Sequence, residues 1–136
     1  MREVFADTSY WIALLNPRDE LHAKAMATSR ELSEARLVTS EMVLAELLNS
    51  FSDSGPRLRL AVVSAVEAVR MSHSVIVFPL TTEQFRRALE RYQQSADKSW
   101  SLTDCTSFQI MESPRIHRAL THDRHFAQAG YEALLR

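Results

Sequence analysis

Val4-Phe5-Ala6-Asp7-Thr8-Ser9-Tyr10-Trp11 is the stretch that decides the fold expected for this chain. Its apolar start predicts a short buried strand over residues 3–7, and the two hydroxyl residues after the acid are good N-caps for a helix over residues 10–16. Open α/β sheets bind their ligands at the carboxyl ends of their strands. Asp7 ends the predicted strand and is therefore the first candidate for a functional residue.

The composition is that of one ordinary globular domain. The 136 residues are 46% hydrophobic and 24% charged, which excludes a disordered chain. A net charge of −1 gives no overall basic field, so any binding of nucleic acid would depend on local arginines or on bound metal. A single cysteine excludes an internal disulfide, and no signal peptide or apolar span of about 20 residues is found. We expect one cytoplasmic domain over residues 1–136, without a membrane segment.

Strand-like and helix-like segments alternate along the chain, which predicts an α/β fold with a parallel sheet, right-handed crossovers and helices on both faces. Strands are expected at residues 3–7, 37–39, 75–78 and 119–121, with the first of them in the centre. Residues 131–135 are expected to form a final short strand or an extended tail. Helices are expected at residues 10–16, 19–35, 41–52, 57–71, 83–95, 102–112 and 124–129. The apolar run 75–78 is typical of a strand covered on both faces. Pro114 and Gly130 are expected to end the last two helices.

Three more acids occupy comparable positions: Glu46, Asp104 and Asp123. Asp123 follows a predicted strand, as Asp7 does, and the other two lie in helices that pack beside strand ends. Clustered carboxylates repel one another and lose hydration, so such a group persists when divalent cations neutralise it. Mg²⁺ and Mn²⁺ prefer carboxylate and water oxygens, and two such ions about 4 Å apart can activate water against a phosphodiester. We therefore expect the four acids to converge on a metal site, roughly 4–8 Å apart.

Each acid also has a purely structural interpretation. Asp7 and Asp123 could each cap the helix that follows, and Asp104 could belong to a capping box that begins at Ser101. Glu46 lies opposite the apolar stripe of its helix and could be part of a solvated face. The recurrence of acids at strand ends favours the shared metal site.

Other residues are weaker candidates. A zinc site formed by Cys105 and the histidines of segment 117–125 fits no closed structural pattern, although His122 could reach the acids because it adjoins Asp123. Trp100 could stack on a base, but an aromatic beside a helix start is more often in the core. Several arginines could contact phosphates: Arg86, Arg87, Arg91, Arg115, Arg118 and Arg124.

Helix 57–71 has a broad apolar face, formed by Leu58, Val62, Val66 and Val69. This face exceeds what a small sheet can cover, so it could line a groove for the helix of a partner protein. Ordinary core packing is the alternative, and full burial of these side chains would favour it.

At these residues the chain resembles PIN-domain nucleases, and most closely the toxins of VapBC-type toxin–antitoxin pairs. The matching segments are Asp7-Thr8-Ser9, Ala45-Glu46-Leu47-Leu48-Asn49, Ser101-Leu102-Thr103-Asp104-Cys105-Thr106-Ser107-Phe108, Leu120-Thr121-His122-Asp123-Arg124-His125-Phe126 and Gln128-Ala129-Gly130-Tyr131. They run through the chain from end to end, in order and with about the right gaps. Each is a weak motif alone, but the ordered set is fairly specific.

The resemblance implies a three-layer α/β/α sandwich and a metal-dependent ribonuclease that leaves a 5′-phosphate. It implies that the four acids are the catalytic metal ligands for Mg²⁺ or Mn²⁺, with Thr8 or Ser9 assisting near Asp7. Asn49 shares a helix side with Glu46 and is a supporting candidate. The resemblance also implies RNA as the substrate, a homodimer, and a small antitoxin that inhibits by occupying the acidic groove.

Three other functions are compatible with the sequence: a stand-alone PIN nuclease without an antitoxin, a phospho-receiver domain, and a non-catalytic binding module. A phospho-receiver domain uses a lysine after a late strand, whereas Lys24 and Lys98 are the only lysines here and both lie elsewhere. Metal-dependent cleavage of RNA would separate a nuclease from the last two.

Overall fold

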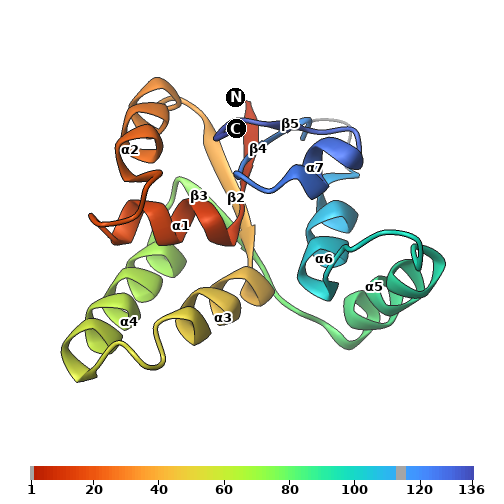
Figure 1. Ribbon diagram of the computed structural model, residues 1–136, viewed down its shortest axis with the longest axis horizontal. Helices are drawn as coiled ribbons and strands as arrows, with labels where there is room; N and C mark the ends of the chain where they lie inside the picture. Colours follow the sequence, from red (N-terminus) through yellow and green to blue (C-terminus); the bar gives the residue numbers. More distant parts are fainter. Residues whose placement is uncertain (1, 113–115) are drawn as a thin grey trace.

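The structure is a computed structural model that describes residues 2–112 and 116–136, and its centre is a five-stranded parallel sheet with helices on both faces (Figure 1). The strands are β1 (Glu3–Ala6), β2 (Arg36–Ser40), β3 (Val75–Phe78), β4 (Arg118–Leu120) and β5 (Glu132–Ala133). Their order in the sheet is β3-β2-β1-β4-β5, and every pairing is parallel. The α/β class and the central position of β1 are thus confirmed, and all carboxyl ends lie at one edge.

Seven helices cover the sheet in the described part of the chain. They are α1 (Thr8–Leu15), α2 (His22–Glu31), α3 (Glu41–Ser50), α4 (Pro56–Met71), α5 (Thr82–Gln94), α6 (Leu102–Met111) and α7 (Arg124–Gln128). Helices α1 to α4 lie on one side of the sheet and α5 to α7 on the other (Figure 1), which confirms the three-layer arrangement. Gly130 follows α7 with φ +96°, as expected of a residue that ends a helix. Pro114 and Arg115 lie outside the described residues.

Two predicted elements differ from the structure. Helix α2 is much shorter than the predicted 19–35 because a turn lies at each end. Before the helix the Asp19 side chain accepts the Leu21 N–H, and after it the Ala35 N–H donates to the Leu32 carbonyl. Strand β3 was expected to be covered on both faces, but it lies at the edge of the sheet and all four of its residues are only half-buried.

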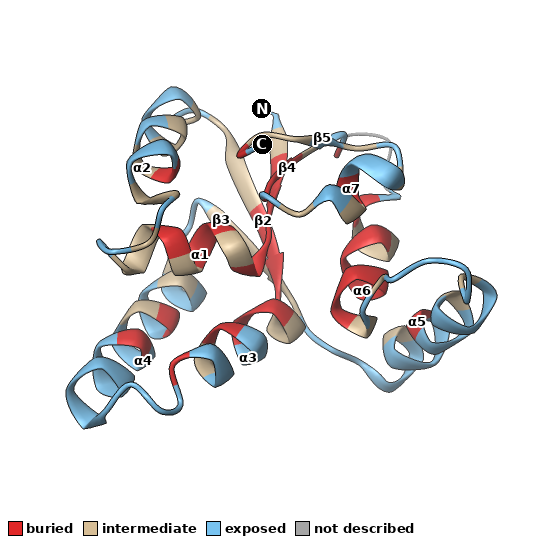
Figure 2. Ribbon diagram, viewed as in Figure 1, coloured by how far each residue is buried: buried red, intermediate tan, exposed pale blue. Residues whose placement is uncertain are grey.

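The core extends over both faces of β1 (Figure 2). Val4 and Phe5 point to opposite faces, and both are fully buried. On the α6–α7 side, Phe126 packs against Phe5 and Phe108, with ring centroids 6.3 and 5.0 Å apart. A strand buried on both faces explains the near-continuous apolar sequence around β1.

The apolar face of α4 is divided between core and surface. Val62 and Val66 are buried and Val69 is half-buried, whereas Leu58 is 37% exposed. Most of the predicted face is therefore core, and full burial is not reached.

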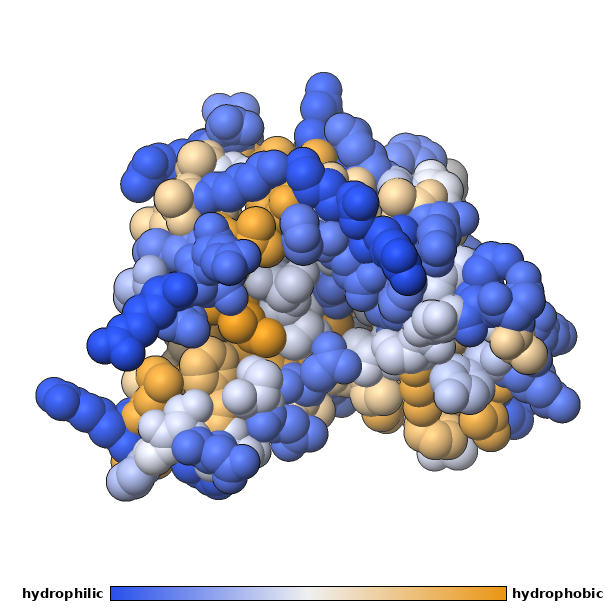
Figure 3. Space-filling view, viewed as in Figure 1, coloured by the Kyte–Doolittle hydropathy of each residue, from blue (hydrophilic) through white to orange (hydrophobic). Residues whose placement is uncertain are grey.

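Helix α5 exposes an apolar stripe of its own, with Phe85, Leu89 and Tyr92 43–51% exposed. Hydrophobic side chains are visible on the surface over α5 (Figure 3). Within residues 2–112 and 116–136, no helix combines the length and apolarity needed to span a bilayer.

Phe126→Ala should lower the free energy of unfolding by about 3–5 kcal/mol, because it removes a buried ring and leaves a cavity between β1 and α6. The control is Met71→Ala, at a side chain that is 79% exposed, which should cost less than about 1 kcal/mol. Urea unfolding of the metal-free protein measures both, and equal losses would contradict the placement of Phe126 in the core.

Candidate active site

Asp7 lies directly after β1 and is only 6% exposed. Its backbone N–H donates to the Leu120 carbonyl at 3.1 Å, which continues the pairing of β1 with β4. Asp7 stands at the N-cap position of α1, as its structural interpretation predicted, but its carboxylate makes none of the side-chain hydrogen bonds typical of a cap. The fold thus places a buried acid at the edge of the sheet where ligands bind.

The hydroxyl of Thr121 connects the two neighbouring strand ends. Its Oγ1 donates to Asp7 Oδ2 at 2.9 Å and accepts the Asp123 N–H at 3.0 Å. Ser9 Oγ lies 3.3 Å from the same hydroxyl and accepts the His122 N–H. This network fixes Asp7 relative to the loop that carries Asp123.

Asp104 is buried in the first turn of α6 and has two roles. It forms the predicted capping box, in which Ser101 Oγ accepts the Asp104 N–H and Asp104 Oδ2 accepts the Ser101 N–H. The same Oδ2 lies 2.9 Å from His125 Nδ1. The structural and the functional interpretations of this acid are therefore compatible.

Asp123 and His125 complete a group with Asp104. Asp123 Oδ1 caps α7 by accepting the His125 N–H at 2.9 Å, and it lies 3.2 Å from His125 Nδ1. One ligand atom from each of Asp104, Asp123 and His125 lies within 4.8 Å of the others, the spacing needed to share a metal ion.

Glu46 occupies an exposed position on α3, and Asn49, one turn later, is exposed as well. The charge of Glu46 is nevertheless one of those that raise the pKa of Asp7, so Glu46 lies close enough to act on the site. Its convergence with the other acids to within 8 Å stays a prediction.

The electrostatics of the site disfavour negative charge. Burial, opposed by the Thr8 N–H and the Thr121 hydroxyl, raises the pKa of Asp7 to about 7, and the charges of Asp104 and Glu46 add to this effect. Burial also raises the pKa of Asp104, against the hydrogen bonds from Ser101 and His125. A bound cation would instead favour the ionised form of both carboxyl groups.

The donor set fits a hard divalent cation. Asp104 and Asp123 are each held through one oxygen, and within the described chain Asp104 Oδ1 and Asp123 Oδ2 accept no hydrogen bond. Thr8 Oγ1, buried beside Asp7, also has no partner among the described residues. Carboxylate and hydroxyl oxygens of this kind are the ligands of Mg²⁺ and Mn²⁺.

Sequence reasoning missed Thr121 and His125 as site residues. His125, and not the expected His122, contacts the acids, since His122 Nδ1 pairs with the Leu135 carbonyl. An available signal was the position of His125 in the first turn of a helix capped by Asp123, which keeps the two residues close. Cys105 is buried and takes no part in the group around Asp104, so the zinc arrangement is not formed.

Comparisons with known proteins agree with this geometry. A family model described as the PIN domain matches residues 4–131. The 23S rRNA-specific endonuclease VapC20 from two strains of Mycobacterium tuberculosis is 33% identical over 134 residues, which cover 94% of this chain and 95% of that protein.

A solved structure extends the likeness to three dimensions. The crystal structure of Mycobacterium tuberculosis VapC20, described as a Sarcin-Ricin loop cleaving toxin, matches with a TM-score of 0.78 and 30% identity, covering 94% of this chain and 95% of that one. The chain therefore belongs to the PIN-domain family of nucleases, and within it to the VapC type.

Proposed function

We propose that the chain is a divalent-metal-dependent endoribonuclease whose metal ligands are Asp7, Glu46, Asp104 and Asp123. The observation that carries the proposal is the group of Asp104, Asp123 and His125 at the carboxyl edge of the sheet, linked to Asp7 through Thr121. The substrate to test first is RNA containing the sarcin–ricin loop of 23S rRNA, because the relative with 33% identity is named for 23S rRNA and its structure for that loop.

The chain's own residues would fix the geometry of the reaction. Thr121 orients Asp7, and His125 in its Nδ1–H form donates toward both Asp104 and Asp123. These contacts hold the acids in place before the substrate binds, which lowers the cost of organising the transition state. Mg²⁺ or Mn²⁺ held by the acids would supply the positive charge that activates water and stabilises the developing charge on phosphate. Thr8, Ser9 and Asn49 are proposed as supporting residues.

We also propose that the chain is the toxin of a cytoplasmic toxin–antitoxin pair and forms a homodimer. The exposed stripe of Phe85, Leu89 and Tyr92 on α5 supports contact with a second copy, because these residues share one helix face. The exposed Leu60 and Val63 of α4 support contact with an antitoxin helix. A neighbouring reading frame for a small DNA-binding protein would distinguish the toxin from a stand-alone nuclease.

Asp7→Asn should reduce cleavage by roughly 10²–10⁴-fold, because a metal with one carboxylate fewer binds more weakly and positions its substrate less well. The matched control is Asp53→Asn, at an exposed loop acid, which should cleave at the wild-type rate. The measurement is cleavage of sarcin–ricin loop RNA in Mg²⁺ or Mn²⁺ and in EDTA. Equal rates for Asp7→Asn and wild type would end the assignment of Asp7.

The contribution of Asp7 to the stability of the metal-free protein should fall as the pH rises from about 4 to 7. The pKa of Asp7 is about 7 in the folded protein and 3.8 for an ordinary aspartate, so in this window the folded state keeps a proton that the unfolded state has lost. The loss amounts to at most about 4 kcal/mol by pH 8. Asp7→Asn removes this pH-dependent contribution. The free energy of unfolding of the variant, relative to that of wild type, should therefore increase between pH 5 and 8. Urea unfolding in EDTA tests this, and a difference that is constant with pH would refute it.

His125→Ala should raise the metal concentration needed for half-maximal cleavage by about 10–100-fold, because it removes the contacts that orient Asp104 and Asp123. The control is His122→Ala, whose ring pairs with the Leu135 carbonyl away from the acids. Metal titrations of cleavage compare the two variants, and indistinguishable curves would show that His125 does not position the ligands.

A further inference from the structure

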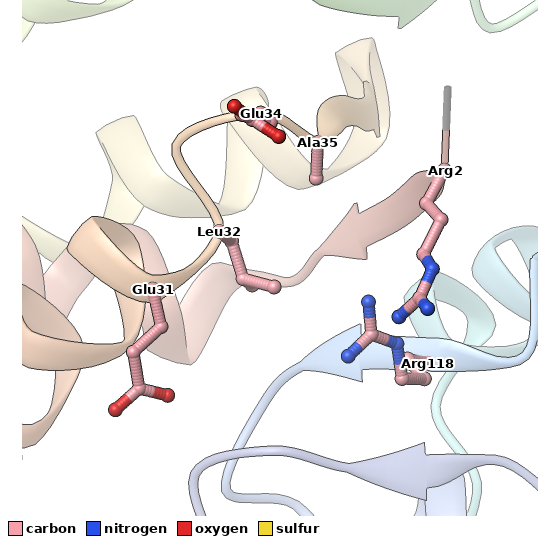
Figure 4. A pocket seen from close by; sticks show the side chains of 6 residues that line it. All are labelled: Arg2, Glu31, Leu32, Glu34, Ala35 and Arg118. Carbon is pink, nitrogen blue, oxygen red and sulfur yellow. The ribbon is translucent and has the colours of Figure 1, made fainter.

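A second polar site lies at the opposite end of the sheet from the acids. A cavity of about 500 Å³ is lined by Arg2, Arg118 and residues of the segment from Glu31 to Ala35 (Figure 4). It shares no lining residue with the group of Asp104, Asp123 and His125. The proposed nuclease function does not use it.

Strand register brings the two arginines together. Phe5 is paired with Ala119, so Arg118 lies beside Val4, and Arg2 is on the same face as Val4 because side chains alternate along a strand. Helix α2 ends at Glu31, and the chain then turns back to β2, so the helix does not extend over this end of the sheet face. Arg2 and Arg118 lie at this end of the sheet face, beyond the part that α2 covers.

The two arginines form no ion pair with the two glutamates that also line the cavity, Glu31 and Glu34. Figure 4 shows the guanidinium groups of Arg2 and Arg118 pointing toward one another, while the carboxylates of Glu31 and Glu34 point away from them. Neither arginine takes part in any ion pair within residues 2–112 and 116–136. Two facing cations favour an anion between them, and guanidinium matches phosphate through paired N–H donors.

We propose that this arginine pair binds a nucleotide phosphate, and specifically a backbone phosphate of the RNA substrate at a distance from the cleavage site. Arg2 and Asp7 are separated by a four-residue strand, about 16 Å at the rise of a β-strand, so the phosphate lies several nucleotides from the scissile bond. This step rests on the proposed ribonuclease function.

The lining of the cavity favours backbone over free nucleotide. Leu32 and Ala35 give an apolar wall against which a ribose can pack. The lining contains no amide, hydroxyl or aromatic side chain that would read or stack a base. Contacts to phosphate alone position an RNA without regard to its sequence.

The test compares RNA binding by wild type and by the Arg2→Gln/Arg118→Gln variant, in EDTA so that no cleavage occurs. The probe is a fluorescein-labelled 20-nucleotide single-stranded RNA, followed by anisotropy from 50 to 300 mM NaCl. We expect roughly tenfold weaker binding, and a slope of log Kd against log salt that is smaller by about 1. The matched control is Arg57→Gln/Arg70→Gln, which removes two exposed arginines from α4 and should change Kd by less than about twofold.

Further arms separate the possible outcomes. The single variant Arg2→Gln changes only an exposed residue, so it should fold even if the double variant does not. Its slope of log Kd against log salt should fall by part of the amount expected for the double variant. In Mg²⁺, a trinucleotide is too short to reach from the acidic site to the arginine pair, so wild type and the double variant should cleave it equally. The double variant should cleave the 20-nucleotide RNA less efficiently than wild type does. If the double variant binds the 20-nucleotide RNA with the same Kd as the control variant, the inference is overturned. The proposed nuclease function is unaffected by that result. Absence of cleavage by wild type on any RNA instead refutes the nuclease function.

Two more probes identify other ligands. Loss of AMP binding with unchanged RNA binding would assign the cavity to a free nucleotide. Loss of polyglutamate binding with unchanged RNA binding would assign it to an acidic protein partner. Either result would overturn the inference.

Discussion

The structure depends on the parallel pairing of β1 with β4, which joins the first strand of the chain to one of the last. The Asp7 N–H donates to Leu120, and the Thr121 hydroxyl reaches the Asp7 carboxylate across 114 positions of sequence. Without this pairing, β1 would be an edge strand and Asp7 would be exposed to water. The buried acid, its raised pKa and its link to Asp123 all follow from one pair of neighbouring strands.

The acids at this edge belong to local structure as well as to the site. Asp104 closes a capping box and Asp123 caps α7, so each carboxylate is fixed by backbone N–H groups of its own helix. A cap is worth about 1 kcal/mol, which partly offsets the cost of burying like charges together. The same hydrogen bonds use one oxygen of each acid and leave the other without a partner among the described residues, so capping would not compete with the proposed metal binding.

Much of the fold and part of the site could be predicted from sequence. The strand that ends at Asp7 was evident because apolar residues meet an acid there, and Ser101 with Asp104 has the spacing of a capping box. Thr121 and His125 were missed because the role of each depends on where its side chain points after distant elements pack together. The edge position of β3 was also missed, because a run of four apolar residues has the same sequence pattern in a central strand and in an edge strand. Local sequence patterns therefore predict the helices and strands. Which elements lie next to one another is determined by tertiary packing.

The late position of β4 in the chain has a consequence for biosynthesis. Proteins are made from the N-terminus, and domains fold as their segments emerge from the ribosome. Asp7 emerges with β1, whereas the strand that buries it and the loop with Asp123 and His125 emerge more than 100 residues later, after residue 117. A nascent chain can therefore form β1, β2 and β3 while the acidic centre is still incomplete. The centre is assembled only after the segment from β4 to α7 has been made.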